Sequence, residues 1–350
     1  MCDVNHGSNH CHRPTKIFER KVAGYLIGKR HFSEVKPMDP LLNWLMSGDV
    51  SLQYLTSKYL LHKPENELAA LRKKIAADGW GKAFQGARKP SGHWGRDFYQ
   101  VKWISSHYTL LDLRHLEIEP TEPILETLNL ILRTCKSADG SINESHTLPS
   151  GDLCVNGMFL NYASFFGIPE SELKSVVDFI LDNIMPDGGF NCNWKRGGAV
   201  HGSMHTTISV LEGLWEFQKA GYDYRKEEIE QTRKHAESFL LKHKLFKSDK
   251  TGEVIDKRWC MLSFPSRWRY DILRALVYFA DAGRPHDPRM EEALRLLQNK
   301  RRKDGTWPVQ MKHPGLVHLE MEKIGEASRF NTLRALRVLI AYGYNGLKEI

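Results

Sequence analysis

The stretch GDLCVNGMFLNYASFF, residues 151–166, opens with Asp152 and Cys154, a carboxylate and a thiol that are both common metal ligands. The apolar residues that follow predict a helix. In a structural interpretation, Asp152 caps this helix and Cys154 is a small buried hydrophobe. In a functional one, both side chains belong to a site at the start of the helix. The predicted elements around Asp152 and Cys154 are needed to choose between these two interpretations.

A repeated pattern organises the chain around this stretch. Asp-Gly turns occur at residues 78–79, 139–140, 187–188 and 304–305, and each is followed by a loop and an amphipathic helical pattern. These patterns begin near residues 104, 151, 202, 266 and 328, with an earlier one from 51. When they are aligned, one column holds His107, Cys154, His205, Arg269 and Phe330.

A second set of helical patterns alternates with the first, at residues 123–136, 172–184 and 289–302. Apolar residues keep helical spacing throughout, so we expect about five or six helical hairpins that bury their faces by stacking. No Pro/Ser-rich linker interrupts the series. We therefore expect one all-α domain over residues 36–350, preceded by a flexible N-terminal arm, residues 1–35, that carries Cys2, His6, His10, Cys11 and His12.

Composition limits the classes of function. The chain of 350 residues has a net charge of +8 and six widely spaced cysteines, and no apolar stretch is long enough to span a membrane. Without a secretory signal or a disulfide framework, a cytoplasmic protein is expected. Zinc-finger, RNP and helix-turn-helix patterns are missing, so no nucleic-acid partner is expected. The oligomeric state stays open.

The DGGF and DGTW turns and the alternating helices resemble the terpenoid cyclase and protein prenyltransferase superfamily, with its squalene-cyclase-type repeats. The resemblance covers roughly residues 40–345 and implies an (α/α)6 toroid whose inner helices surround a central cavity. In the prenyltransferase β-subunits, zinc is held by an Asp-x-Cys and by a later His-Thr. Asp152-Leu153-Cys154 and His205-Thr206 match these two motifs.

The resemblance therefore implies a zinc site. Asp152, Cys154 and His205 would supply three ligands and leave one position open. Cys192, on the turn before the helix of His205, could be a fourth ligand. It could also replace Asp152, giving a Cys-Cys-His set that resembles the lanthionine-forming cyclases. Zinc would activate a substrate thiol as the thiolate, or activate a water molecule for hydrolysis.

Three departures weaken the step from zinc to prenyl transfer. The segment NESHTLPSG before Asp152 has no lysine or arginine to hold a diphosphate, and Val155 stands where the family has Tyr. The family's α-subunit has no counterpart in this sequence. No Asp-x-Asp-Asp motif is present, which argues against a class II terpene cyclase.

Other candidate residues lie near the starts of the expected inner helices. The candidate catalytic residues are His107, Tyr108, His201 and Asp271; His201 could instead orient a ligand histidine. The candidate substrate- or anion-binding residues are Lys102, Trp103, Arg267, Arg269 and Arg329. The arginines could equally form structural ion pairs with Asp271, Glu320 or Glu322, and the aromatic residues of 92–108 could be core.

These observations favour a zinc-dependent transferase or cyclase that acts on an apolar, anionic or peptide substrate in a central cavity. The alternatives are a toroid-type lyase or hydrolase that uses His, Tyr and Arg, and a non-catalytic binder of a hydrophobic ligand.

Overall fold

The computed structural model of the chain describes residues 39–145 and 147–344. The chain divides into two units, Met1–Pro37 and Met38–Ile350, and every described residue belongs to the second. The expected N-terminal arm with its cysteines and histidines lies outside the described residues.

The described part of the second unit is almost entirely helical. Its α-helices are α1 (Pro40–Met46), α2 (Val50–Tyr59), α3 (Glu65–Ala77), α4 (Gly79–Gly86), α5 (Ser106–His115), α6 (Glu122–Thr134), α7 (Leu153–Phe165), α8 (Glu170–Leu181), α9 (Trp194–Gly197), α10 (Met204–Lys219), α11 (Lys226–Lys242), α12 (Ile272–Asp281), α13 (Glu291–Asn299) and α14 (Arg329–Ala341). Three short 3₁₀ turns, Lys102–Ile104, Lys257–Cys260 and Pro288–Met290, complete the helices. The strands β1 (Trp307–Pro308) and β2 (Ala327–Ser328) pair antiparallel, with Trp307 opposite Ser328. None of the described helices combines the length and apolarity needed to cross a bilayer.

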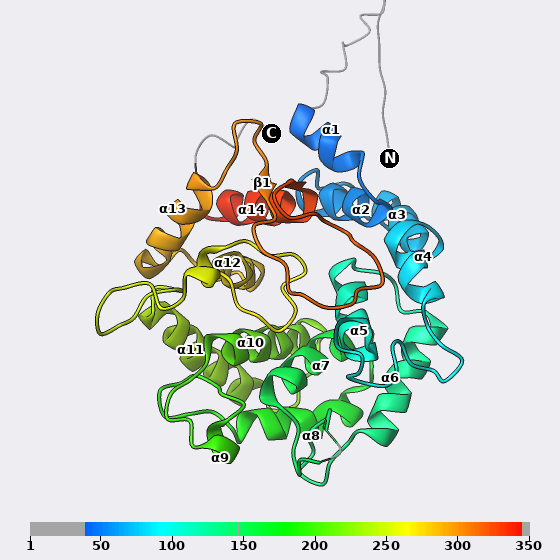
Figure 1. Cartoon of the computed structure of the whole chain (residues 1–350), viewed down its shortest axis with the longest axis vertical. Helices are drawn as coiled ribbons and strands as arrows, with labels where there is room; N and C mark the ends of the chain where they lie inside the picture. The colour runs from blue at the N-terminus through cyan, green and yellow to red at the C-terminus, as the bar shows by residue number, and fades with distance from the viewer. Residues whose placement is uncertain (1–38, 146, 345–350) are drawn as a thin grey trace, which may run out of the picture. The chain divides into compact units, whose positions relative to one another are not determined.

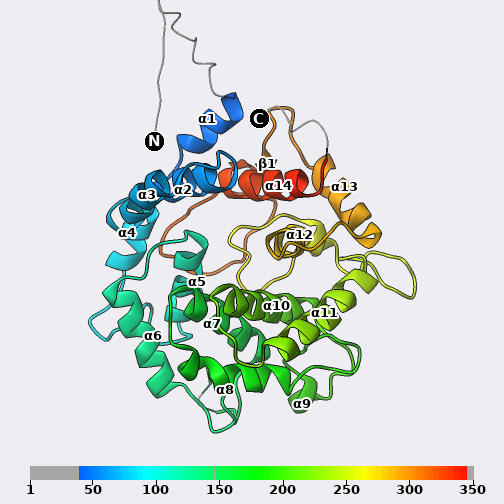
Figure 2. The same ribbon diagram turned by 180° about the vertical axis from the view of Figure 1, so that it is seen from behind.

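Inner and outer helices alternate around a ring (Figures 1 and 2). The inner helices α5, α7, α10, α12 and α14 each pack on the next, α14 packs on α2, and α4 fills the space between α2 and α5. The outer helices α6, α8, α11 and α13 each precede an inner helix along the chain. With α1 before α2 and α3 before α5, the described residues make six helical hairpins, and the all-α (α/α)6 toroid expected from the repeats is confirmed.

Three of the four Asp-Gly turns connect an outer helix to an inner one by a loop, as expected, whereas Asp78-Gly79 begins α4 directly, with Asp78 as its N-cap. In three of them the glycine has a positive φ of 84–87° and the aspartate accepts a hydrogen bond from the N–H two residues on, as Asp304 does from Thr306 at 3.0 Å. That combination is an Asx turn, which reverses the chain locally at little cost for glycine. Asp187 also accepts from the N–H of Gly202 at 2.8 Å, which fixes the end of the loop just before α10.

One inner helix begins later than its pattern predicted. The pattern from residue 266 suggested a helix there, but α12 begins at Ile272. Arg267 has a φ of +58°, and the Asp271 carboxylate accepts from the N–H of Arg274 as an N-cap. The segment 266–271 is therefore a loop, and Arg269 precedes the helix instead of lying on it.

The inner helices α7 and α10 approach each other closely at two glycines. A Cβ on Gly157 would lie 2.5 Å from the Ser209 carbonyl oxygen, and one on Gly213 would overlap the carbonyl oxygen of Gly157. These contacts are with backbone atoms, so neither helix can yield without moving. Because α7 carries Asp152 and Cys154 at its start and α10 carries His205, the close packing also sets how these residues are spaced.

We expect Gly157→Ala to lower the free energy of unfolding by about 1 to 3 kcal/mol, because a methyl group is forced against a fixed backbone. Gly86→Ala is the matched control, since a Cβ there meets nothing within 4 Å and alanine favours the helix. Urea unfolding of the two variants measures the difference. Equal stability of both variants would show that α7 and α10 can move apart freely.

Candidate metal centre

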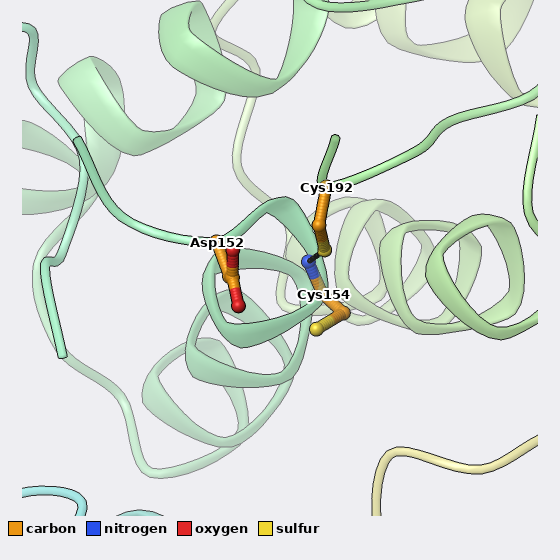
Figure 3. A group of neighbouring side chains, drawn as sticks. All are labelled: Asp152, Cys154 and Cys192. Carbon is orange, nitrogen blue, oxygen red and sulfur yellow. Dashed lines mark hydrogen bonds between the residues drawn. The ribbon is translucent and has the colours of Figure 1, made fainter. Parts of the chain in front are cut away.

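Asp152, Cys154 and Cys192 meet where α7 begins. One ligand atom from each, a carboxylate oxygen and two Sγ atoms, lies within 4.8 Å of the others. Asp152 and Cys154 come from the first turn of α7, and Cys192 reaches the same turn from the loop that leads towards α10 (Figure 3). The two segments are 38 residues apart in the chain. The structure therefore brings together three of the four predicted ligands.

The carboxylate of Asp152 does not cap its helix. Asp152 occupies the N-cap position of α7 but its side chain makes no capping hydrogen bond, whereas Ser203, Ser328 and Asp271 do cap α10, α14 and α12. The structural interpretation of Asp152 as a helix cap is therefore wrong.

Glu144, which no sequence pattern indicated, holds the backbone N–H of Asp152. The Asp152 N–H donates to the carboxylate oxygens of Glu144 at 3.1 and 3.2 Å. Glu144 lies in NESHTLPSG, the segment before Asp152 that has no lysine or arginine. Its carboxylate also adds negative charge that raises the pKa of Cys154.

The two cysteines share their protons unequally. Hydrogen bonds from the Cys154 thiol, the Thr206 hydroxyl and the Cys154 backbone N–H outweigh burial and lower the pKa of Cys192 to about 7. The backbone bond is 3.4 Å long and comes from the first turn of α7, where free N–H groups and the helix dipole stabilise an anion. The hydrogen bond between the Cys154 and Cys192 thiols, together with burial, raises the pKa of Cys154 well above its usual value. Near neutral pH the pair can thus carry one thiolate, at Cys192.

His205 lies beside this group but is not part of it. Its Nδ1 accepts a hydrogen bond from the Tyr270 N–H at 2.7 Å, so the neutral imidazole carries its proton on Nε2. A zinc-binding histidine instead donates from its second nitrogen, which leaves the first unprotonated for the metal. Burial and the nearby Arg274 and Arg269 lower the pKa of His205 to about 4, so the ring is neutral at pH 7. In this structure His205 is oriented as an N–H donor, in contrast to the predicted role as a ligand.

A cavity of about 560 Å³ opens at the group formed by Asp152, Cys154 and Cys192. The residues that line it are Tyr99, Lys102, Leu148, Asp152, Cys154, Asn191, Cys192, Asn193, Gly197, Ser203, His205, Thr206 and Trp268. One wall is cationic and aromatic. Lys102 Nζ lies 5.1 Å and 5.6 Å from the ring centroids of Trp103 and Trp268, and the guanidinium of Arg269 stacks 4.6 Å from Trp268. Burial, together with Arg269, lowers the pKa of Lys102.

The predicted catalytic residues do not line this cavity. His107 is fully buried with Nδ1 3.0 Å from the Tyr162 hydroxyl, and Tyr108 lies behind Tyr99, with 3.1 Å between their hydroxyls. Asp271 is a buried helix cap that accepts from Ser263 Oγ at 2.7 Å. His201 is exposed. Tyr99, which lines the cavity, is the residue of this neighbourhood best placed to contact a ligand.

The predicted anion-binding residues separate into two groups. Lys102 lines the cavity and Arg269 stacks on its wall, whereas Trp103 is a buried support whose Nε1 donates to the Pro314 carbonyl. Arg267 is buried in an ion pair with Asp112 at 2.5 Å. The structural ion pair offered as an alternative thus exists for Arg267, but its partner is not one of the three acids considered.

Arg329 lies elsewhere, next to α1. Its guanidinium donates to the Trp44 carbonyl at 3.0 Å and to the Ser47 hydroxyl at 3.3 Å, and it stacks on the Trp44 ring. The structure therefore does not bring it to the cavity. Its contacts instead join the last inner helix to the first hairpin.

Buried neutral histidines make stability depend on pH. Burial lowers the pKa of His107 to about 3, and burial with nearby arginines lowers that of His313 to about 4. Below the ordinary histidine pKa of about 6.5 the unfolded chain takes up protons that the folded chain refuses. Stability from these groups is complete above pH 6.5 and is lost as the pH falls, towards 4 for His313 and towards 3 for His107.

Between pH 6 and pH 4.5 we expect the free energy of unfolding of His107→Leu to fall less steeply than that of wild type, by about 1.4 kcal/mol per pH unit. The reason is that unfolding of the variant takes up about one proton fewer. Urea unfolding of metal-free protein across this range measures the slope. His201→Leu, which removes an exposed imidazole, is the control. An unchanged slope in His107→Leu would contradict the assignment of His107 as a neutral core residue.

Comparison with known proteins gives likenesses of fold at low identity. No family model and no curated protein matches the sequence. Among solved structures, a polysaccharide lyase, BACCELL_00875, is 13% identical with a TM-score of 0.47, over 83% of this chain and 88% of that one. The type II terpene cyclase MstE from Scytonema is 12% identical with a TM-score of 0.32, over 79% of this chain and 98% of that one. These values assign neither a family nor an activity to the chain.

Proposed function

We propose that this protein is a zinc-dependent transferase or cyclase whose metal is held by Asp152, Cys154 and Cys192. The observation that carries the proposal is the meeting of these three side chains within 4.8 Å at the floor of a 560 Å³ cavity. Two thiols and one carboxylate form a donor set that suits zinc, and three protein ligands leave one tetrahedral position for a substrate. This set replaces the predicted His205 with Cys192.

The chain prepares the ligands before a metal arrives. Hydrogen bonds from Cys154 and Thr206 lower the pKa of Cys192 to about 7, so this ligand loses its proton more readily than an ordinary thiol and Cys154 has the remaining proton to release. Glu144 fixes the backbone of Asp152. When bound, zinc would supply a Lewis acid that lowers the pKa of a substrate thiol or of water. His205, with its proton on Nε2, lines the same cavity and would donate a hydrogen bond to the substrate.

The cavity suggests the kind of substrate. Lys102 and Arg269 provide positive charge, and Tyr99, Leu148 and Trp268 provide aromatic and apolar surface. A ligand with an anionic head and an apolar body satisfies both, and an isoprenoid diphosphate is one such molecule. Lys102 and Arg269 thus offer the positive charge that is missing just upstream of Asp152.

Metal analysis of the purified protein tests the proposal. After loading with zinc and removal of excess, we expect about one zinc per chain, and none in the double variant Cys154→Ala, Cys192→Ala. Cys260→Ser, which removes a half-buried cysteine outside the ligand group, should keep the metal. Cobalt in place of zinc should give the absorption bands of thiolate coordination.

The results also separate the other functions. Metal content well below one per chain, or metal that survives the double substitution, would overturn the proposal. Turnover of an anionic substrate by metal-free protein would favour the lyase or hydrolase. A metal-free protein that binds apolar ligands without turnover would be the non-catalytic binder.

A further inference from the structure

A second cavity lies among the inner helices. It shares no lining residue with the cavity at Asp152, Cys154 and Cys192, called here the metal cavity. Its volume is about 120 Å³, room for a few water molecules or one small ion. The lining is rich in charge, with Arg114, His115, Glu117, Glu212, Glu216, Lys219, Arg274, Asp281, Arg334 and Arg337 among its residues. They come from inner helices on all sides of the ring.

Every acid in this lining already has a basic partner. The pairs are Arg114 with Glu216, Arg274 with Glu212, Arg337 with Asp281, and Lys58 with Glu117. Lys219 shares Glu216 at 3.4 Å. No acid of the lining is left to pair with a further base. A base without a partner therefore gives the cavity an uncompensated positive charge.

The remaining base is Arg334, on α14. Among the described residues, its guanidinium has no hydrogen bond and no ion pair. Asp271 and Glu212 attract it from a distance, but Asp271 is engaged by Ser263 and the N–H of Arg274, and Glu212 by the Arg274 side chain. Arg334 is half-buried, so it lines this cavity as a cation that has no anion partner and keeps some contact with solvent.

Two further polar groups of the same cavity lack partners within the described residues. They are Arg114 Nε and His115 Nδ1, which are both shielded from solvent. Burial and the surrounding arginines, Arg114 first, lower the pKa of His115 well below its usual value, so the ring is neutral and has one N–H to offer. Buried polar atoms without partners are rare in proteins, and a bound ion or water is a common explanation.

We propose that this cavity binds a small oxyanion of phosphate size, held by Arg334 between the lining residues Arg114 and His115. A guanidinium presents a planar fork of donors that matches the oxygens of phosphate, sulfate or carboxylate. The anion would complete the ion pairing of the cavity and give Arg334 an acceptor. It would be either free inorganic phosphate or the phosphate group of a small metabolite.

Calorimetric titration with inorganic phosphate at constant ionic strength tests this site. We expect wild-type protein to bind one phosphate and Arg334→Met to bind at least about tenfold more weakly, since one charge-assisted bond is lost. Arg295→Met, which removes an exposed arginine, and Lys102→Met, which alters only the metal cavity, should bind as wild type. Titration with glycerol 3-phosphate then distinguishes the sources: binding shows that the site accepts a metabolite, and failure shows that it takes the free ion.

The contrary results are equally clear. Lack of phosphate binding by wild type at millimolar concentration, or equal binding by Arg334→Met, overturns the proposal. Loss of binding in Lys102→Met alone would place the anion in the metal cavity and overturn it as well. Without phosphate, Arg334→Met should melt no lower than wild type, because it removes an unpartnered charge; a clear fall in its Tm would show that Arg334 has a structural partner.

Discussion

Zinc affinity should fall by at least about 100-fold in Cys192→Ser and stay within a few-fold of wild type in His205→Ala. Cys192 Sγ is one of the three ligand atoms that meet at the start of α7. His205 Nδ1 accepts the Tyr270 N–H, so Nε2 carries the proton and neither nitrogen is free to bind a metal. Partners that only orient a ligand are worth 10- to 100-fold in affinity, so loss of a ligand should cost at least the upper end of that range.

Competition with a chromogenic zinc chelator measures these affinities. Cys260→Ser controls for general effects of cysteine removal. The reverse ranking, with His205→Ala weak and Cys192→Ser unaffected, would establish the Asp-Cys-His set of the prenyltransferase-like motif. That result would require the His205 ring to leave the Tyr270 N–H when the metal binds.

Breaking the ion pair between Arg267 and Asp112 should be the most destabilising change of a charged residue in the ring. Both side chains are almost fully buried, with 6% and 2% of their surfaces exposed, and they lie 2.5 Å apart. Asp112→Asn should lower the free energy of unfolding by about 3 to 5 kcal/mol, because arginine cannot lose its charge and would stay buried without a partner. Arg267→Met should cost slightly less, since the remaining Asp112 can take up a proton.

The double variant Arg267→Met, Asp112→Leu should recover most of that loss, because apolar residues of similar size often replace a buried pair without penalty. Urea unfolding of wild type, Arg267→Met, Asp112→Leu and the double variant gives the coupling free energy. Arg337→Met is a control at a partly exposed ion pair, with Asp281, and should cost much less. Single variants as stable as wild type would show that Arg267 is not structural and would restore it as a candidate anion ligand.

The repeats predicted the fold because helical periodicity and Asp-Gly turns are local properties of the chain. The positions of His107, Cys154, His205 and Phe330 in one column were correct, since each is the second residue of its inner helix. The start of α12 differs from the predicted start for a local reason too. The N-cap of Asp271 is recognisable in sequence, but the apolar pattern upstream of it was read as helix.

The site was predictable only in part, because its geometry depends on contacts between distant segments. Asp152 and Cys154 were identified by residue type and spacing. Whether Cys192 or His205 joins them depends on a loop fixed by Asp187 and on the Tyr270 N–H, 65 residues from His205. The pairing of Arg267 with Asp112 spans 155 residues, and no pattern in the sequence connects them.

The ring is closed at one place without a covalent link, where α14 packs on α2 and Arg329 binds the turn after α1. The other five junctions between hairpins are continuous chain. The order of hairpins around the ring therefore does not require the chain to begin at α1. A circular permutant that links the ends by a flexible connector and opens at the exposed turn of residues 249–253 should build the same ring, with its non-covalent junction moved to a new position.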